Sequence, residues 1–277
     1  MIASTRARCA AALSLLLVLP VGGAVAETPL EQLKRTGACE RCNFKLGELR
    51  GLDVKNARLR GAVFREADMK GVSLVGADLR GADLRRTEAE RADLSGAQLE
   101  GAAMRAVDLE KAKLTGARFY DADLRNADLG ETDLEKASFV DADLRLANMV
   151  RASAVGAVFR GAKMDGVVLE RTWLTNADLT GVRLKYGDLD RVKARGAVFR
   201  DADLSGAHFS SADLTGADLS GANLEGALFR RTRLVGADLR HSRGLQAARL
   251  IGACGDSTTR LPDGFSLKTC RSQEAED

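Results

Sequence analysis

The sequence predicts a solenoid, a chain that winds into a rod around an apolar shaft. One residue in every five is apolar from residue 44 to residue 239, which gives (239 − 44)/5 + 1 = 40 successive positions without an exception. The residue two places earlier is usually Ala, and the other places hold mostly polar residues and Gly. A period of five matches neither a helix nor a strand. A chain that keeps one residue in five inside must therefore turn a corner every five residues.

The repeat unit resembles that of a known family. Segments such as Ala82-Asp83-Leu84 follow the pattern A(D/N)LxG, which is similar to the repeat of the pentapeptide repeat proteins, and residues 44–239 follow it without a break in register. The resemblance implies an all-β solenoid, a right-handed quadrilateral β-helix with four pentapeptides per coil. Residues 44–243 would then form about ten coils of about 20 residues, with short helical caps.

The phenylalanines support a coil of 20 residues. Eight of the nine occupy the apolar register. Within three groups they are separated by multiples of 20: Phe44 and Phe64; Phe119, Phe139, Phe159 and Phe199; Phe209 and Phe229. Because stacked coils contact only their neighbours, each group should lie on one side of the rod, ring over ring. Neighbouring coils should be ~4.8 Å apart, the usual strand spacing.

Residues 1–26 have the features of a secretory signal peptide. Arg6 and Arg8 form its charged start, a short apolar stretch follows, and an A-x-A cleavage site ends at Ala26, before Glu27. The alternative, an uncleaved membrane anchor, is disfavoured because the apolar stretch is short and rich in Gly. We therefore expect an exported protein, periplasmic or secreted. Its mature chain would have 277 − 26 = 251 residues and no membrane span.

Residues 27–43 are expected to cap the N-terminal end of the rod. Thr28 and Glu31 form a capping box, with Pro29 at the first helical position. Gly37 is suited to end this short helix. A cap is needed because the open end of a β-helix leaves strand edges unpaired. A docking helix for a partner is the alternative interpretation.

Cys39 and Cys42 follow this helix, in places that the repeat register puts at the entrance of the shaft. A structural disulfide fits an exported chain. Free or reactive thiols, and hence a redox protein, are an alternative, although a thioredoxin-like pair requires a βαβ context that the repeat does not offer. A zinc site is a further alternative and would need two more ligands.

The repeat register fails at the start of residues 244–277, which are expected to form a C-terminal cap and a polar tail. Residues 245–251 are apolar at helical spacing, and residues 261–264 form a turn signal. The layout around Cys254 and Cys270 resembles the tail of exported bacterial pentapeptide repeat proteins, which implies a disulfide between these two residues. The mature chain then holds four cysteines, an even number, as in exported disulfide proteins.

Nothing in the repeat predicts catalysis. The two histidines, His208 and His241, fall in outward places without a nucleophile beside them, and the carboxylates stand in regular rows, as solvated side chains do. A glycine-rich phosphate loop would need a strand-to-helix junction, which the repeat lacks. We therefore expect a protein that is not an enzyme, with no cofactor, metal ion or small-molecule substrate.

One surface row is a candidate contact strip for a partner. Five arginines are spaced 20 residues apart and would stack into a basic ladder: Arg65, Arg85, Arg105, Arg125 and Arg145. Three residues further on, an acidic ladder would run parallel to it: Asp68, Glu88, Asp108 and Asp128. These charges either compensate one another on a solvated surface or bind an acidic or mixed-charge partner. Trp173 is a further contact candidate by its residue type.

The net charge helps to decide between a protein-interaction scaffold and a protein that mimics DNA. The net charge of +3 falls to about +1 without the two arginines of the signal peptide. The resemblance implies, as one alternative, a DNA mimic that modulates DNA gyrase and confers quinolone resistance, but such a mimic needs negative charge along its length. The rod is also neither basic nor aromatic enough outside for direct nucleic-acid binding. We therefore predict a non-catalytic, exported structural or protein-interaction scaffold with an unknown protein partner. A homodimer through one of the caps is left open.

Overall fold

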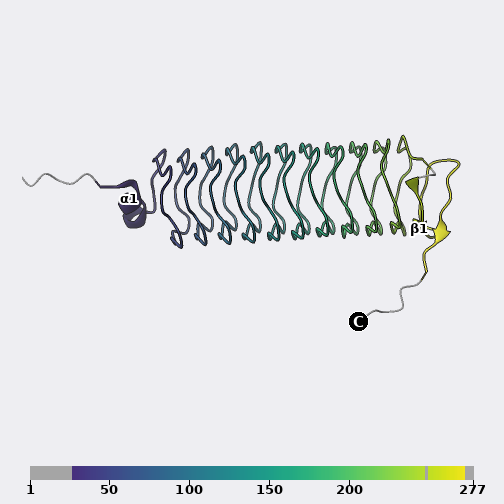
Figure 1. The fold of residues 1–277 in the computed structure, drawn as a ribbon, viewed down its shortest axis with the longest axis horizontal. Helices are drawn as coiled ribbons and strands as arrows, with labels where there is room; N and C mark the ends of the chain where they lie inside the picture. Colours follow the sequence, from purple (N-terminus) through teal and green to yellow (C-terminus); the bar gives the residue numbers. More distant parts are fainter. Residues whose placement is uncertain (1–26, 247–248, 272–277) are drawn as a thin grey trace, which may run out of the picture.

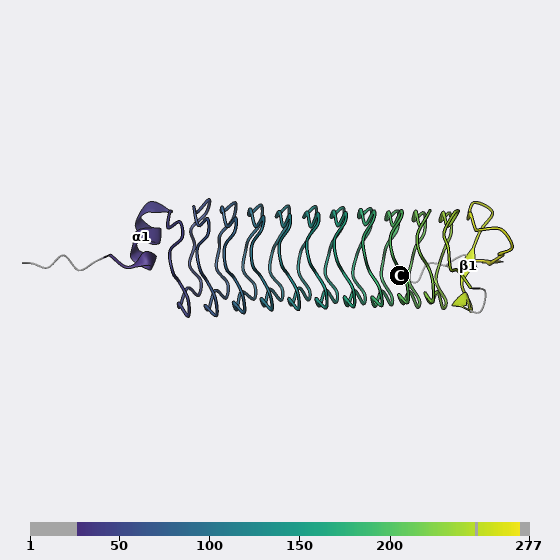
Figure 2. The same ribbon diagram turned by 90° about the horizontal axis from the view of Figure 1, so that it is seen from above.

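The chain forms a long rod of stacked coils in the computed structural model, which describes residues 27–246 and 249–271. The helix α1 lies at one end of the rod and the strand β1 at the other (Figure 1). The perpendicular view shows the same succession of coils along the whole rod (Figure 2). The predicted signal peptide lies outside the described residues. No helix in the described part of the chain is long and apolar enough to cross a membrane.

Parallel backbone bridges define the coil. They join residues 20 positions apart, from Ala38 and Arg58 at one end to Asn223 and Arg243 at the other. One bridging residue occurs in every five, so each coil has four sides, as the repeat and the phenylalanine spacing predicted. The strands are single bridges because a corner every five residues leaves only a short extended stretch on each side.

The corners share one backbone conformation. The second residue of the turn has a positive φ at every position from 41 to 241 in steps of five, and 23 of these residues are not Gly. This left-handed conformation costs a residue with a Cβ atom about 1 kcal/mol. The fold imposes this cost because the chain must turn a corner of the four-sided coil within two residues to begin the next side.

The apolar register fills the shaft, as predicted. Its side chains are buried from Phe44 to Leu239, apart from the partly buried Val54, and the Ala two places earlier is buried in most repeats. The predicted ring stacking is confirmed for rings 20 residues apart, whereas Phe199 packs edge-on against Phe209, with the ring centroids 6.1 Å apart. The ring centroids of Phe139 lie 4.5 Å from Phe119 and 5.0 Å from Phe159, with the ring planes within 3°.

Threonines replace the inward Ala in four repeats and are buried. Three of their hydroxyls donate to carbonyl oxygens of the preceding coil at 2.7 or 2.8 Å: Thr87 to Phe64, Thr172 to Met149 and Thr232 to Phe209. A buried hydroxyl without an acceptor would destabilise the shaft. The branched side chain is therefore accepted because the coil beneath it supplies a carbonyl oxygen.

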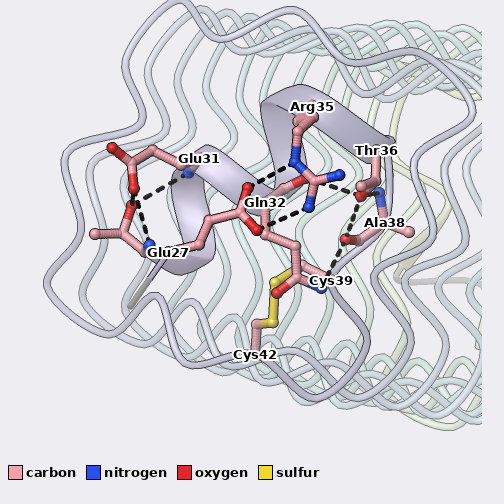
Figure 3. Close-up of polar contacts among 9 residues, drawn as sticks. Glu27, Glu31, Gln32, Arg35, Thr36, Ala38, Cys39 and Cys42 are labelled. Atoms are coloured by element: carbon pink, nitrogen blue, oxygen red, sulfur yellow. Dashed lines mark hydrogen bonds and ion pairs between the residues drawn. A yellow bond between two sulfur atoms is a disulfide. The ribbon is translucent and has the colours of Figure 1, made fainter. Parts of the chain in front are cut away.

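The predicted N-terminal helix is present as α1, Pro29–Thr36. Thr28 and Glu31 make both hydrogen bonds of the capping box, and Gly37 ends the helix with a φ of 67°. Leu33 is buried against the first coils. Figure 3 shows the helix beside the chain that enters the rod, with the two carboxylate oxygens of Glu27 bound by Arg35 at 2.8 Å.

The C-terminal segment differs from the prediction. No α-helix occurs among the described residues after Arg243; instead the backbone ladder continues, with Leu234 N donating to Cys254 O at 2.8 Å. β1, Cys254–Gly255, then pairs in parallel with β2, Lys268–Thr269. The physical reason is the open edge of the last coil. Its unpaired backbone groups are satisfied by an extended segment, which a helix cannot do because its own groups are already paired.

Candidate interaction surface

The five predicted arginines lie in one line along the rod. They occupy the first turn position of the same corner in successive coils, because the bridges place residues 20 apart directly over one another. We call Arg65, Arg85, Arg105, Arg125 and Arg145 the arginine row. The sequence therefore predicted their alignment correctly.

The carboxylates that pair with this row are not those of the predicted parallel ladder. Asp83, Asp123 and Asp143, each two residues before an arginine, accept from it instead. The Nη2 atoms of Arg125 and Arg145 lie 2.6 Å from their aspartates. A residue two places earlier is close because it flanks the same turn, whereas a residue three places later lies on the next side of the coil.

Two members of the predicted acidic ladder pair with cations on its other flank. Asp68 binds Arg50 at 2.7 Å, and Glu88 binds Lys70 at 2.8 Å. These cations belong to the next corner of the coil, away from the arginine row. Asp108 and Asp128 make no ion pair with the described residues, so this ladder is compensated only at Asp68 and Glu88, and by partners that the sequence analysis did not match to them.

The aspartates beside the row are held in their charged form. The hydrogen bond from Arg125 lowers the pKa of Asp123, although burial opposes it. Burial raises the pKa of Asp143, but the hydrogen bonds from Arg145 outweigh it, so that the pKa lies below its ordinary value. Both carboxylates consequently neutralise their arginines at neutral pH.

Arg105 is the exception within the arginine row. The residue two places before it is Ala103. Arg65 likewise follows Val63, but it binds Asp83 of the next coil at 2.8 Å, whereas Arg105 makes no such bond to Asp123. Arg105 is exposed and makes no ion pair with the described residues, whereas the other four arginines each bind an aspartate. The centre of the row therefore carries a guanidinium without a direct ion-pair partner among the described residues, although its charge helps to lower the pKa of Asp123 in the next coil.

Two hollows meet at Arg105. The smaller has a volume of about 220 Å³ and is bordered by the preceding corner residues, among them Arg65 and Arg85. The larger, which we call the corner hollow, has a volume of about 590 Å³. Its lining residues come from successive coils: Arg105, Arg125, Asn126, Arg145, Leu146, Asp165, Gly166 and Tyr186. The corner hollow thus follows the arginine row along the rod.

Two apolar side chains border the corner hollow and were not predicted as a pair. Leu146 and Tyr186 are 63% and 76% exposed, although both have positive φ angles. Each side chain lies over a glycine of the next coil, because a Cβ atom on Gly166 would be 2.8 Å from Leu146 Cδ2 and one on Gly206 would be 2.5 Å from Tyr186 Cδ1. Leu146 and Tyr186 are 40 residues apart, which equals two coils. This spacing in the sequence could have predicted that they lie on the same corner of the rod.

Trp173 does not join this surface. It bridges to Ser153 and Lys193 on another side of the coil, where Lys193 Nζ lies 5.6 Å from its ring centroid. The side that carries Asp68 separates it from the arginine row. The residues first considered as one contact strip are thus two separate features.

The four cysteines of the two ends lie in pairs. Cys39 and Cys42 are at disulfide distance, with their Cα atoms 5.4 Å apart, and Cys39 is fully buried (Figure 3). Cys254 and Cys270 form the second pair, with Cα atoms 4.8 Å apart. Both are consistent with an oxidising compartment. Within the described ranges, no group of three or more His, Cys, Asp or Glu side chains could hold a metal ion.

Comparison with known proteins identifies the repeat. The family model for pentapeptide repeats matches eight copies, over residues 48–86, 92–130, 117–153, 129–171, 142–181, 173–210, 188–221 and 207–243. The chain belongs to the pentapeptide repeat family. Pentapeptide repeat proteins fold as right-handed quadrilateral β-helices, and they are generally non-enzymatic structural or interaction proteins. No curated protein matches the sequence.

Solved structures of other pentapeptide repeat proteins resemble the chain. HetL, which is involved in heterocyst differentiation regulation in Nostoc sp. strain PCC 7120, is 29% identical over 86% of this chain and 97% of its own, with a TM-score of 0.43. QnrB1, a plasmid-mediated fluoroquinolone resistance protein, is 21% identical over 79% of this chain and 94% of its own, with a TM-score of 0.32. A protein of the Arabidopsis thaliana thylakoid lumen is 33% identical over 35% of this chain and 68% of its own, with a TM-score of 0.22.

Proposed function

We propose that this pentapeptide repeat protein is a non-catalytic scaffold of the exported type with cysteine-containing caps, and that it binds a protein partner along the arginine row. One observation carries the proposal: a continuous buried shaft holds five arginines in line, with exposed apolar side chains beside them. Side chains on such a shaft are presented at fixed spacing, so a partner meets a surface that is already ordered. Preorganisation of this kind lowers the entropic cost of association.

Two features support export. Residues 1–26 have the features of a cleavable signal, and both cysteine pairs are at disulfide distance at the ends of the rod. Disulfides persist in oxidising compartments and are rare in the cytosol. The scaffold would therefore act in the periplasm or outside the cell.

The alternative, a DNA mimic that modulates gyrase, is less well supported. A mimic must present uncompensated negative charge, but many acidic side chains of the described rod are paired with arginine or lysine, as in Arg195 with Asp213 at 2.6 Å and Arg200 with Asp218 at 2.5 Å. An export signal would also separate the protein from cytosolic gyrase.

The proposal is tested by site-specific photocrosslinking in the producing cells. Asn126 lies in the corner hollow, and Asn176 occupies the equivalent turn position at another corner, with φ angles of 57° and 56°. A photoreactive amino acid at position 126 should give a discrete adduct with one protein in the exported fraction, and one at position 176 should not. Intact mass should place the N-terminus at Glu27.

Two results would contradict the proposal. Adducts of equal yield from both positions, or from neither, would show that the corner hollow is not a partner surface. A full-length chain recovered from the cytosol with free thiols would show that the protein is not exported. Gyrase inhibition would then be the next assay.

A further inference from the structure

We propose that the corner hollow binds an extended acidic segment of the partner protein. A carboxylate of this segment would pair with Arg105, and an apolar side chain would pack against Leu146 and Tyr186. The inference rests on the proposed scaffold function and adds the chemistry of the partner.

The shape of the corner hollow suits an extended chain. From Arg105 to Tyr186 the lining residues belong to five successive coils, which are four steps of ~4.8 Å, or about 19 Å. An extended peptide advances about 3.4 Å per residue, so about five or six residues would occupy this length. An extended segment can therefore contact both ends of the corner hollow at once.

The charge of the corner hollow selects an anion at one end. Arg105 makes no ion pair with the described residues, and its guanidinium can bind a carboxylate through two parallel hydrogen bonds. Asp165 is the only carboxylate among the lining residues, and Arg183 binds it at 2.5 Å. An incoming acidic side chain therefore meets positive charge at Arg105 without repulsion from an unpaired carboxylate in the lining.

The apolar end is formed by side chains that folding does not use. Leu146 and Tyr186 are mostly exposed and adopt positive φ angles, so neither burial nor local conformation favours them over Gly at these positions. They also rest on Gly166 and Gly206, where a Cβ atom would collide with them. Burial of both by a partner would recover hydrophobic free energy that the free protein does not gain.

The two ends give the site a direction. The arginines lie toward the N-terminal end of the rod and Tyr186 toward the C-terminal end. A segment whose acidic residues precede or follow an apolar residue can lie along the hollow only with its acidic part toward Arg105. A probe in which acidic and apolar residues alternate evenly should consequently bind less tightly than one in which they are separated.

The test uses a fluorescein-labelled synthetic peptide of about seven residues, with three glutamates separated by serines and followed by leucine and phenylalanine. This is slightly longer than the five or six residues that would occupy the site. Fluorescence anisotropy with the full mature chain should show saturable binding that weakens with salt. We expect Arg105→Glu to raise Kd about tenfold or more and Tyr186→Gly about tenfold. Thermal unfolding would confirm that both variants are folded.

Matched controls lie at other corners. Arg230 is exposed at the same turn position and makes no ion pair with the described residues, and Tyr120 is the other tyrosine, 38% exposed. Arg230→Glu and Tyr120→Ala should leave Kd within about twofold. A lysine-for-glutamate version of the peptide should not bind.

Several outcomes would overturn the inference. The peptide does not bind to the unmodified protein, the control variants weaken binding as much as Arg105→Glu does, or Arg105→Glu leaves Kd unchanged. If a partner is crosslinked at position 126 but the peptide does not bind, the proposed acidic segment is wrong and the scaffold function still holds. If the peptide binds but no partner is crosslinked, the proposed scaffold function is wrong and the corner hollow is only an anion-binding groove.

Discussion

The second turn residue of each corner has its conformation set by the fold and not by its own side chain. Ser210 and Ser211 are adjacent turn residues, and only Ser211 has a positive φ, 59°. At position 211 Gly should be more stable than Ala by about 1 kcal/mol, because Ala pays the left-handed cost. At position 210 Ala should be at least as stable as Gly. Urea unfolding of the four variants measures both differences, and an equal preference at the two positions would contradict the assignment.

Charge pairing at single residues makes stability depend on pH. Asp78 accepts from Arg80 Nε at 2.8 Å and Nη2 at 2.6 Å, and mainly these hydrogen bonds, against the effect of burial, lower its pKa from 3.8 to about 2. A carboxyl with a lowered pKa in the folded state stabilises the protein above its unfolded pKa, and this contribution is lost as the pH falls from about 4 to about 2.

We expect Asp78→Asn to lower the free energy of unfolding by about 1–2 kcal/mol at pH 7 and by much less near pH 2. Denaturant unfolding at several pH values measures the change. Asp108 is the matched control, since burial raises its pKa. The effect of Asp108→Asn should therefore change with pH in the opposite sense. A pH-independent effect of Asp78→Asn would show that the ion pair contributes nothing to the acid sensitivity.

At the scale of elements, the two ends of the rod are attached differently. α1 leads directly into the ladder, where Arg58 N donates to Gly37 O and Cys39 N donates to Arg58 O, both at 2.9 Å. Beyond Arg260 the described chain makes no further bridge to a coil. It is attached through β2, the pair of Cys254 with Cys270, and the partly buried side chains of Leu261, Phe265 and Leu267. The C-terminal segment should therefore be the less stable end.

Removal of the second cysteine pair tests this difference. In the variant with Cys254→Ala and Cys270→Ala, amide exchange of residues 261–270 should accelerate strongly, because a disulfide that closes a loop of about 15 residues is worth about 3 kcal/mol. Exchange in the central coils should stay unchanged. The corresponding change at Cys39 and Cys42, only three residues apart, constrains a much shorter loop and should have a smaller entropic effect. Equal protection in all three proteins would contradict the attachment proposed for the C-terminal segment.

On the scale of the whole molecule, stability is distributed along one dimension. Each coil is bonded only to the coil before it and the coil after it, as the regular bridges between residues 20 apart show. The helix α1 and the strand β1 lie at opposite ends of the rod, with the stacked coils between them (Figure 2). A defect in the shaft should therefore weaken its own coil and the neighbouring coils most.

Leu134→Ala provides the test, because Leu134 is fully buried near the middle of the rod. We expect a loss of about 2–4 kcal/mol and faster amide exchange centred on the coils around residue 134, with less effect toward both ends. Lys136→Ala, an exposed change at the same corner, should leave exchange as it is. A uniform loss of protection along the rod would indicate all-or-none unfolding of the whole molecule.

The sequence by itself determined the architecture of this protein. A period of five and phenylalanines 20 apart were sufficient for the four-sided coil, the stacked rings and the alignment of the arginine row, because in a solenoid the distance along the chain sets the neighbours in space. The capping box at Thr28 could also be predicted from the sequence, since all its groups lie within one helical turn.

Only the tertiary structure decided the surface chemistry and the C-terminal end. Which carboxylate pairs with an arginine depends on the turn geometry, which favoured the aspartate two residues earlier over the acid three residues later. The exposed position of Leu146 and Tyr186 along the corner hollow depends on glycines one coil away. Residues 249–260 followed the last coil as a chiefly extended segment because an open strand edge offers backbone hydrogen bonds, which outweighed the helical spacing of residues 245–251.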